Sequence, residues 1–190
     1  MKKNLLIALW FTLVTTVMFG VLYPLAITGL AQVLFPGRAN GQLIERNGKV
    51  VGSRIIGQAF SGPSYFHSRP SSAGTGYDPT SSGGSNLAPT NKTLIERVKG
   101  DAQKLHSENP TAPIPVDLIT SSGSGLDPDI SPAAAEFQIP RVAHSRGMKE
   151  DDVRSLVRKH TKDRDLGFLG EPSVNVLELN LELDSLRTAR

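Results

Sequence analysis

The sequence contains no cysteine and only four histidines, and these absences exclude several kinds of site. Without cysteine the chain has no disulfide, no thiolate nucleophile and no cysteine-ligated metal, although the compartment stays undecided. The histidines, which are His67, His106, His144 and His160, are never three or four residues apart, so a helical metal site has no basis. The H-E-x-x-H, G-x-S-x-G and phosphate-loop motifs are missing too. We therefore predict no catalytic residue and no metal ligand.

Acidic and basic side chains are missing from a long N-terminal stretch. Between Asn4 and Gly37 there is no Asp, Glu, Lys, Arg or His, and most side chains are apolar. A helix crosses the hydrocarbon core of a bilayer with roughly 20 such residues. Pro24 is compatible with such a helix and predicts a local kink. The sequence therefore predicts one transmembrane helix within residues 1–37.

A cleaved signal peptide is the alternative interpretation of this stretch. Lys2 and Lys3 would form its basic start, and Gly29-Leu30-Ala31 would form a cleavage site that releases a secreted protein. The apolar part of a signal peptide is normally about 7–15 residues long, and this run is much longer. We therefore expect the helix to be retained in the membrane.

The charges that flank the apolar stretch bear on its orientation. Lys2 and Lys3 favour a cytoplasmic N-terminus. Arg38, Arg46 and Lys49 follow on the other side, but large domains are translocated largely regardless of their charge. We therefore expect a single-pass protein whose residues 38–190 form one extracytoplasmic domain. A domain of about 150 residues is large enough to bury a core of its own.

The rest of the charge pattern gives little support to nucleic-acid binding. The formal net charge is +3, and Lys2 and Lys3 contribute to it, so the domain is close to neutral. No stripe of Lys and Arg with interleaved aromatic residues is present. We expect contact with membrane lipid and no nucleic-acid partner.

The domain combines strand and helix patterns. Asn47-Gly48 lies between Gln42–Arg46 and Lys49–Gln58, and Asn-Gly accepts the positive φ values of a type I′ turn, so a β-hairpin is expected. A short strand is expected at Val116–Thr120. Leucines alternate with polar residues in Val174–Leu183, which predicts a half-buried strand.

Three helices are expected between these strands. They cover Asn91–Ser107, capped by Thr90 or Asn91, then Ser131-Pro132 to Arg146, with Pro140 as a break or kink and Gly147 as its end, and Glu150–His160. Strands and helices are not in regular alternation, so the expected fold class is α+β.

Two stretches rich in Gly and Ser are candidates for binding. Residues 61–90 form a long loop that Tyr65, Phe66, Tyr77 and Leu87 are able to fasten to the domain. Within it, Ser81–Asn86 offers backbone N–H groups of the kind that cradle anions, as does Ser121–Gly125. Neither stretch has the Lys that would neutralise phosphate, which favours ordinary turns. A membrane-anchored anion-binding protein or enzyme that uses these loops is the alternative function.

Several motifs resemble, in the same order, the accessory chain KdpC of the bacterial Kdp potassium pump. They are Gly57–Phe60, Tyr65–Ser71, Ser82–Leu87, Ser122–Asp127, Ser131–Ala135, Gln138–Ala143, Gly170–Pro172 and Val174–Leu181. Two positions depart from the usual pattern of that family. Ser68 stands where Gly is usual, which bears on the turn at Arg69-Pro70, and Asp129 stands where His or Asn is common.

The resemblance implies a non-catalytic accessory subunit of a high-affinity, ATP-driven potassium uptake pump in the bacterial inner membrane. Its partners would be the channel-like KdpA, the P-type ATPase KdpB and the small KdpF. The chain would stabilise the complex and raise the affinity of the ATPase for ATP, with no cofactor of its own.

The resemblance also implies a group of nucleotide-binding residues. They are Ser82, Gly83, Gly84, Ser85, Asn86 and Gln138. The expected orientation places these residues outside the cytoplasm, where ATP is scarce. The two expectations conflict, and the membrane argument is the stronger of the two.

Overall fold

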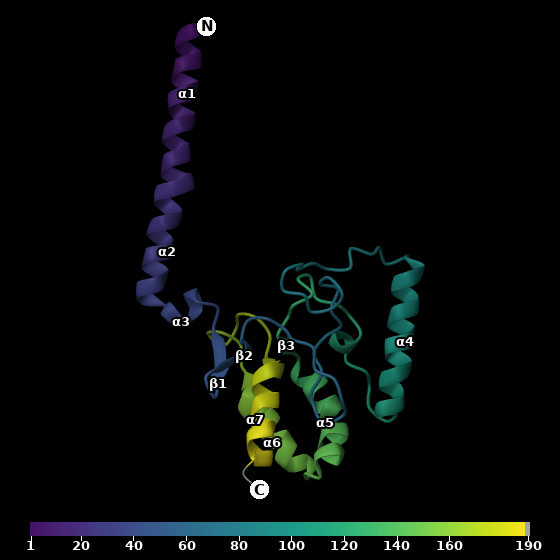
Figure 1. Ribbon diagram of the computed structural model, residues 1–190. Coiled ribbons are helices and arrows are strands. Elements are labelled where there is room, and N and C mark those ends of the chain that lie inside the picture. Colours follow the sequence, from purple (N-terminus) through teal and green to yellow (C-terminus); the bar gives the residue numbers. More distant parts are fainter. Residues whose placement is uncertain (189–190) are drawn as a thin grey trace.

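The computed structural model describes residues 1–188 and begins with a long helical rod. The rod consists of α1 (Lys2–Val17), the π-helical turn η1 (Met18–Leu22) and α2 (Tyr23–Leu34), and it stands away from the rest of the chain (Figure 1). Its 33 residues form a helix long and apolar enough to cross a membrane. The side chains of the rod are not buried by the rest of the protein.

The π-helical turn accommodates Pro24 within the rod. Proline has no N–H group, so a regular helix would lose one backbone hydrogen bond at this position. Just before it, the N–H of Tyr23 donates to the carbonyl of Met18, five residues earlier, as in a π-turn. The local irregularity expected at Pro24 therefore takes the form of a π-turn, and the helix continues to Leu34.

A β-hairpin follows the rod after the short helix α3 (Pro36–Ala39). Strands β1 (Leu43–Arg46) and β2 (Lys49–Ser53) are antiparallel, and Asn47 and Gly48 form the turn with φ values of 51° and 72°. These positive values are those of a type I′ turn. The predicted hairpin is confirmed, although its second strand ends at Ser53 and not at Gln58.

The core lies between a small sheet and three helices. The sheet has the antiparallel order β3 (Asp129–Ile130), β5 (Ser173–Asn175) and β4 (Thr161–Lys162). Helices α5 (Pro132–Arg146), α6 (Glu150–His160) and α7 (Val176–Thr188) pack beside it (Figure 1). The buried side chains include Phe66, Ile130, Phe137, Ile139, Val142, Val153, Val157, Val174, Leu179 and Leu183. The predicted α+β class, with one N-terminal apolar helix ahead of a mixed domain, is confirmed.

Two helix starts follow the capping residues expected from the sequence. The Ser131 hydroxyl accepts a hydrogen bond from the Ala134 N–H at the start of α5. Asn91 Oδ1 accepts from the Thr93 N–H at the start of α4 (Lys92–Glu108). Helix α5 runs through Pro140 without a break and ends at Gly147, which is left-handed with φ 63°.

The predicted strand Val174–Leu183 is wrong over most of its length. Only Ser173–Asn175 is a strand, and Val176–Thr188 is helix α7. The fully buried positions in the helix include Val176, Leu179, Asn180 and Leu183, which have helical spacing. Asn180 is polar, so the sequence pattern does not mark it as part of this buried face. What stands out instead is the alternation of the leucines, which is typical of a strand.

The predicted strand Val116–Thr120 is also wrong. The segment contains a turn of 3₁₀-helix, η2 (Val116–Leu118), and the Thr120 hydroxyl donates back to the Val116 carbonyl at 2.8 Å. The carboxylate of Asp117 accepts from the Ser131 N–H at 2.8 Å. These side-chain hydrogen bonds stabilise a turn, and they compete with the backbone pairing that a β-strand would need.

Candidate functional site

Two buried amide side chains hold the backbone of Phe66 and His67 inside the domain. Asn180 on α7 accepts from the Phe66 N–H and donates to the Phe66 carbonyl, both at 2.9 Å. Gln138 on α5 accepts from the His67 N–H at 2.8 Å and donates to the His67 carbonyl at 3.1 Å. Both amides are almost completely buried. We call Gln138 and Asn180 the amide clamp.

Arg141 fastens the segment that precedes the amide clamp. One terminal nitrogen of its guanidinium donates to the carbonyls of Pro63 and Tyr65 at 2.8 and 2.9 Å. The other donates to Gln138 Oε1 at 2.7 Å, and its Nε pairs with a Glu108 carboxylate oxygen at 3.1 Å. The long loop is therefore tied to α5 and to the C-terminal end of α4.

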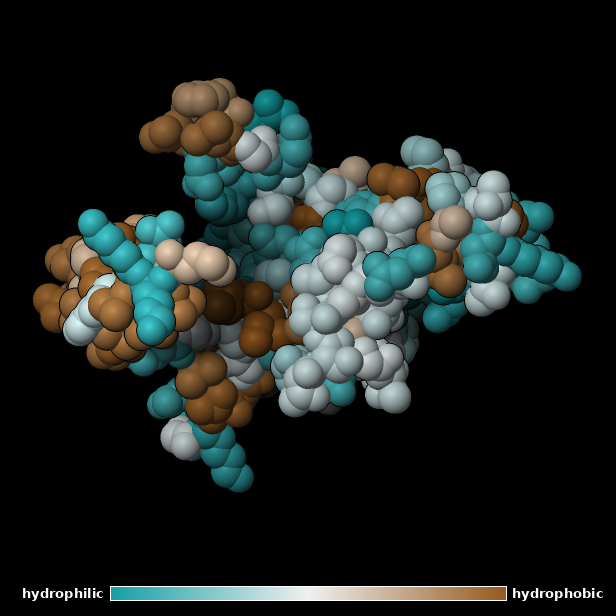
Figure 2. Space-filling view, turned by 90° about the horizontal axis from the view of Figure 1, so that it is seen from above, coloured by the Kyte–Doolittle hydropathy of each residue, from teal (hydrophilic) through white to brown (hydrophobic). Residues whose placement is uncertain are grey.

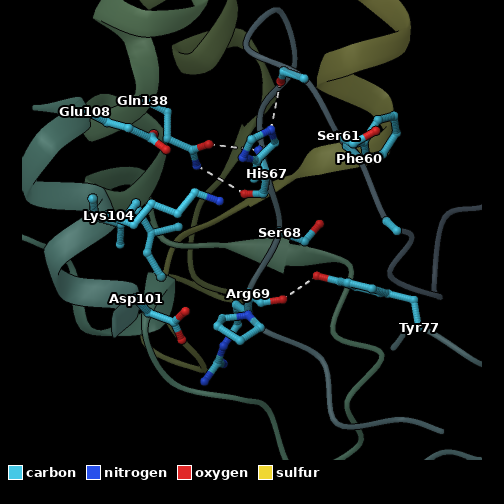
Figure 3. A pocket seen from close by; sticks show the side chains of 15 residues that line it. Phe60, Ser61, His67, Ser68, Arg69, Tyr77, Asp101, Lys104, Glu108 and Gln138 are labelled. Atoms are coloured by element: carbon cyan, nitrogen blue, oxygen red, sulfur yellow. Dashed lines mark hydrogen bonds between the residues drawn. The ribbon is translucent and has the colours of Figure 1, made fainter. Parts of the chain in front are cut away.

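A cavity of about 400 Å³ lies between α4 and the loop segment that the clamp holds. Asp101, Lys104 and Glu108 approach it from α4, and His67 and Arg69 approach it from the loop (Figure 3). Both carboxylates are engaged with arginines, since Asp101 pairs with Arg97 and Glu108 with Arg141. The remaining wall includes Phe60, Ser61, Ser68, Pro70, Tyr77, Leu105, Leu118 and Gln138. The cavity is mixed in charge, so it does not select strongly for a cation or an anion.

His67 is held neutral at the edge of this cavity. Its Nε2–H donates to the Gly62 carbonyl at 2.8 Å, which places the proton on Nε2 in the neutral ring. Burial lowers the pKa of His67 below its ordinary value, and the nearby Arg141 charge lowers it further. A neutral, hydrogen-bonded ring fits a structural role in this loop.

The two stretches rich in Gly and Ser pack directly against each other. The Gly83 N–H and the Ser82 hydroxyl both donate to the Ser124 carbonyl, at 2.8 and 3.0 Å. The Ser71 hydroxyl donates to the Gly125 carbonyl at 2.6 Å. Two of the donors that suggested an anion cradle, the Ser82 hydroxyl and the Gly83 N–H, are therefore used in joining the two loops.

Glycine is required where these loops approach most closely. Gly125 has φ 68°, and a Cβ added there would lie 2.6 Å from the Gly83 carbonyl oxygen and 2.7 Å from the Ala73 nitrogen. A Cβ added at Gly84 would lie 3.2 Å from the Gly123 carbonyl oxygen. By contrast, a Cβ on Gly123 would meet nothing within 4 Å.

The structure separates the residues that the resemblance grouped as nucleotide-binding. Ser82, Gly83 and Gly84 lie at the loop junction, and Ser85 and the left-handed Asn86 (φ 52°) follow them. Gln138 lies elsewhere, in the amide clamp. Within residues 1–188, the cavity wall includes Gln138 but no residue of 82–86. The amide of Gln138 already has hydrogen-bond partners on both its oxygen and its nitrogen.

Sequence reasoning misses Asn180 and Arg141 as organisers of this region. The predicted strand places Asn180 on its solvent side, so nothing in the sequence indicates that Asn180 is buried. Phe66 is expected to fasten the loop, and it is fully buried. Tyr77 also contributes, because its hydroxyl donates to the Arg69 carbonyl (Figure 3). Leu87 remains 36% exposed.

His67 and His160 occupy different surroundings. His160 pairs with Glu182, which also receives a hydrogen bond from Lys159, and His67 lies in the loop described above. In the part of the chain that the structure describes, no three His, Asp or Glu side chains are grouped so that they could hold a metal ion.

Comparison with known proteins gives one consistent result. Residues 5–185 match the sequence profile of the family described as KdpC, K⁺-transporting ATPase, c chain. A protein of Koribacter versatilis named potassium-transporting ATPase KdpC subunit is 62% identical over 184 residues, which cover 97% of this chain and 95% of that protein. Proteins with the same name from Caulobacter vibrioides and Acidobacterium capsulatum are 58% and 55% identical, and the alignments cover 90% and 97% of this chain and 87% and 99% of those proteins.

These matches extend over almost the whole chain, from the apolar helix through the amide clamp to α7. The resemblance seen in the sequence motifs is confirmed. The chain belongs to the KdpC family of K⁺-transporting ATPase subunits and is a component of a potassium-transporting complex.

Proposed function

We propose that this chain is a non-catalytic accessory subunit that stabilises an ATP-driven potassium uptake pump. The observation that carries the proposal is the combination of the KdpC family match with a single exposed apolar helix ahead of a compactly hydrogen-bonded domain. Its two candidate loops are joined to each other, and its cavity is mixed in charge. These features favour a structural subunit over an extracytoplasmic enzyme or anion-binding protein.

The proposed partners are the channel-like KdpA, the P-type ATPase KdpB and the small KdpF. In this arrangement the rod spans the bacterial inner membrane with its N-terminus in the cytoplasm, and the domain lies outside. Lys2 and Lys3 support this orientation. The rod is kept as part of the mature protein, because its apolar run exceeds that of a signal peptide.

Any effect of Gln138 on nucleotide binding would have to be indirect, without contact between its side chain and ATP. Its amide holds His67, Ala134 and Arg141, so a direct contact with ATP would require the amide clamp to open. An effect of this chain on the ATP affinity of the P-type ATPase would then come from the stability of the assembled complex. Residues 82–86 remain the proposed candidates for any direct contact.

Purification from native membranes tests the proposal. A tagged full-length chain, expressed in cells starved of potassium, should bring down a P-type ATPase and a channel-like protein in fixed proportion. Potassium-dependent ATP hydrolysis by the purified complex should decay faster when this chain is removed. Recovery of the chain alone, or a complex equally durable without it, would contradict the proposal.

A further inference from the structure

The cavity between α4 and the loop of the amide clamp has no part in the function proposed above. Its volume is about 400 Å³. Sites for small molecules in proteins have volumes of roughly 300–1,000 Å³, and they combine apolar walls with a few polar groups. The cavity is therefore large enough for a small ligand, and its wall decides which kind of ligand it suits.

Helix α4 forms one side of the cavity and is only lightly packed on the domain. None of the residues of this helix, Lys92–Glu108, is fully buried (Figure 2 shows the domain from above). In the middle of the helix, Arg97 donates to the Ile119 carbonyl at 3.3 Å, and at its C-terminal end Glu108 pairs with Arg141. A ligand in the cavity would add contacts between α4 and the loop.

Three charged side chains of α4 lie on the face that borders the cavity. Asp101, Lys104 and Glu108 are three and four positions apart, which places them on one side of a helix, and they reach toward the loop (Figure 3). Lys104 would ordinarily pair with one of these carboxylates. Both carboxylates pair with arginines instead, Asp101 with Arg97 at 2.9 Å and Glu108 with Arg141 at 3.1 Å.

This pairing leaves groups of both charges available to a ligand. Within residues 1–188, the Lys104 ammonium has neither an ion pair nor a hydrogen bond. The arginines approach Asp101 Oδ2 and Glu108 Oε2, and in the same part of the chain Asp101 Oδ1 and Glu108 Oε1 accept no hydrogen bond. The face of α4 therefore presents one free cationic donor with an anionic acceptor on either side of it.

Apolar side chains complete the wall. They include Phe60, Pro70, Leu105 and Leu118. Phe60 and Leu105 are only partly buried where they pack against the core. A hydrocarbon group of modest size would cover apolar surface here that is still open to solvent, and this burial favours binding.

A cavity that favours neither sign of charge suits a molecule that carries both. We propose that this cavity binds a free amino acid with an apolar side chain. The carboxylate of the ligand accepts a hydrogen bond from Lys104, its ammonium donates to a free oxygen of Asp101 or Glu108, and its side chain lies against the apolar wall. The proposal concerns this chain alone and does not depend on any pump partner.

Three probes with one carbon skeleton test the need for both charges. They are L-leucine, 4-methylpentanoate, which lacks the amino group, and L-leucinamide, which lacks the carboxylate. A ligand that binds only the folded protein raises its thermal unfolding midpoint. Leucine should raise the midpoint of the full-length chain in detergent, and calorimetric titration should show that it binds about tenfold more tightly than either analogue. L-phenylalanine is a second amino acid probe of the same class.

A lysine variant assigns the site to the face of α4. Lys104→Met keeps the apolar stem and removes the donor for the carboxylate, so the affinity for leucine should fall about tenfold and the affinity for leucinamide should not change. Without a probe, the unfolding midpoint of this variant should equal that of wild type, because Lys104 has no partner to lose. Lys99→Met is the matched control, since Lys99 is exposed on α4 and does not line the cavity.

The results distinguish this site from an ordinary solvated helix face. If neither leucine nor phenylalanine raises the midpoint, or if an analogue binds as tightly as leucine, the proposal is overturned. Equal affinities of the Lys104→Met and Lys99→Met variants for leucine would overturn it too. Failure to recover pump components with the chain would count against the proposed function and would leave these measurements unaffected.

Discussion

At the scale of single residues, the amide clamp gives the backbone of Phe66 and His67 the hydrogen-bond partners that a neighbouring strand would supply in a sheet. Phe66 and His67 pass between α5 and α7, and side chains of these two helices pair with their backbone N–H and carbonyl groups. The side chains of Gln138 and Asn180 each supply one donor and one acceptor to these groups. Buried backbone polar groups must be paired, so these two amides allow an irregular loop to cross the core.

Replacement of Gln138 by leucine should destabilise the domain. The change leaves the partly buried His67 N–H and carbonyl without their partner, and a buried group costs about 1–3 kcal/mol when unpaired. Urea unfolding of the full-length chain in detergent measures the loss. Gln103→Leu on the exposed side of α4 is the control and should change the unfolding free energy little. Equal stability of the Gln138→Leu variant would show that the clamp is dispensable.

His67 should make the stability of the domain sensitive to acid. Burial and Arg141 lower its pKa below 6.5 in the folded state, so the unfolded chain binds the proton more readily. Stability contributed by the neutral ring is therefore complete above pH 6.5 and decreases as the pH falls below that value. Thermal unfolding between pH 7.5 and 5 should show a smaller decrease for His67→Gln than for wild type. The same pH dependence in both proteins would assign the loss to other groups, such as Glu182.

The sequence identifies residues with local roles better than residues with distant partners. Ser131, Asn91 and Gly147 act on backbone groups a few positions away, and the sequence predicts their roles correctly. Asn180 contacts Phe66, which is 114 positions earlier in the chain. No local pattern reports such a contact, because it exists only after the chain has folded.

At the scale of elements, the same distinction explains which predictions are correct. The hairpin around Asn47-Gly48 and helix α6 depend on turn chemistry and on helical spacing within one segment. The alternating leucines of helix α7 predict a strand, although its buried face includes Asn180. The candidate loops are separate stretches in the sequence, and their mutual packing depends on the core that brings them together.

The junction of the two Gly- and Ser-rich loops should be sensitive to one methyl group. In a Gly125→Ala variant the new Cβ would overlap the Gly83 carbonyl and the Ala73 nitrogen, and φ 68° would be strained. We expect a loss of stability of about 1–3 kcal/mol or more. Gly123→Ala is a matched control two positions away, where the added Cβ meets nothing within 4 Å. Calorimetry of both variants compares them, and equal unfolding temperatures would contradict a tight junction.

The membrane helix should contribute packing as well as anchorage. A Cβ on Gly29 would meet nothing within 4 Å, so the chain itself tolerates a larger residue there. Gly20, Thr28 and Gly29 give the helix small faces, and small faces let membrane helices approach closely. Gly29→Leu should therefore lower recovery of the pump complex without reducing the amount of this chain in the membrane. Ile27→Leu is the control on the same helix, and equal recovery from both variants would leave the helix as a simple tether.

At the scale of the whole molecule, the protein exposes apolar side chains that it does not itself cover. The side chains along the rod from Lys2 to Leu34 are not buried, and Leu166, Phe168 and Leu169 in the turn between β4 and β5 are exposed as well. Lipid and a membrane-embedded partner together would cover these surfaces. This distribution agrees with a pump component whose family match spans both the helix and the domain.

The side of the membrane on which the domain lies decides between the remaining roles, and the lack of cysteine makes it measurable. A single cysteine introduced by Ser107→Cys, on the exposed side of α4, should react with a membrane-impermeant maleimide in intact cells whose outer membrane is permeable. A cysteine introduced by Lys3→Cys should react only after the cells are lysed. That result would keep residues 82–86 away from cytoplasmic ATP and leave stabilisation of the pump as the function. The reverse labelling pattern would contradict the orientation inferred from Lys2 and Lys3, and it would bring the Ser82–Asn86 loop within reach of the nucleotide.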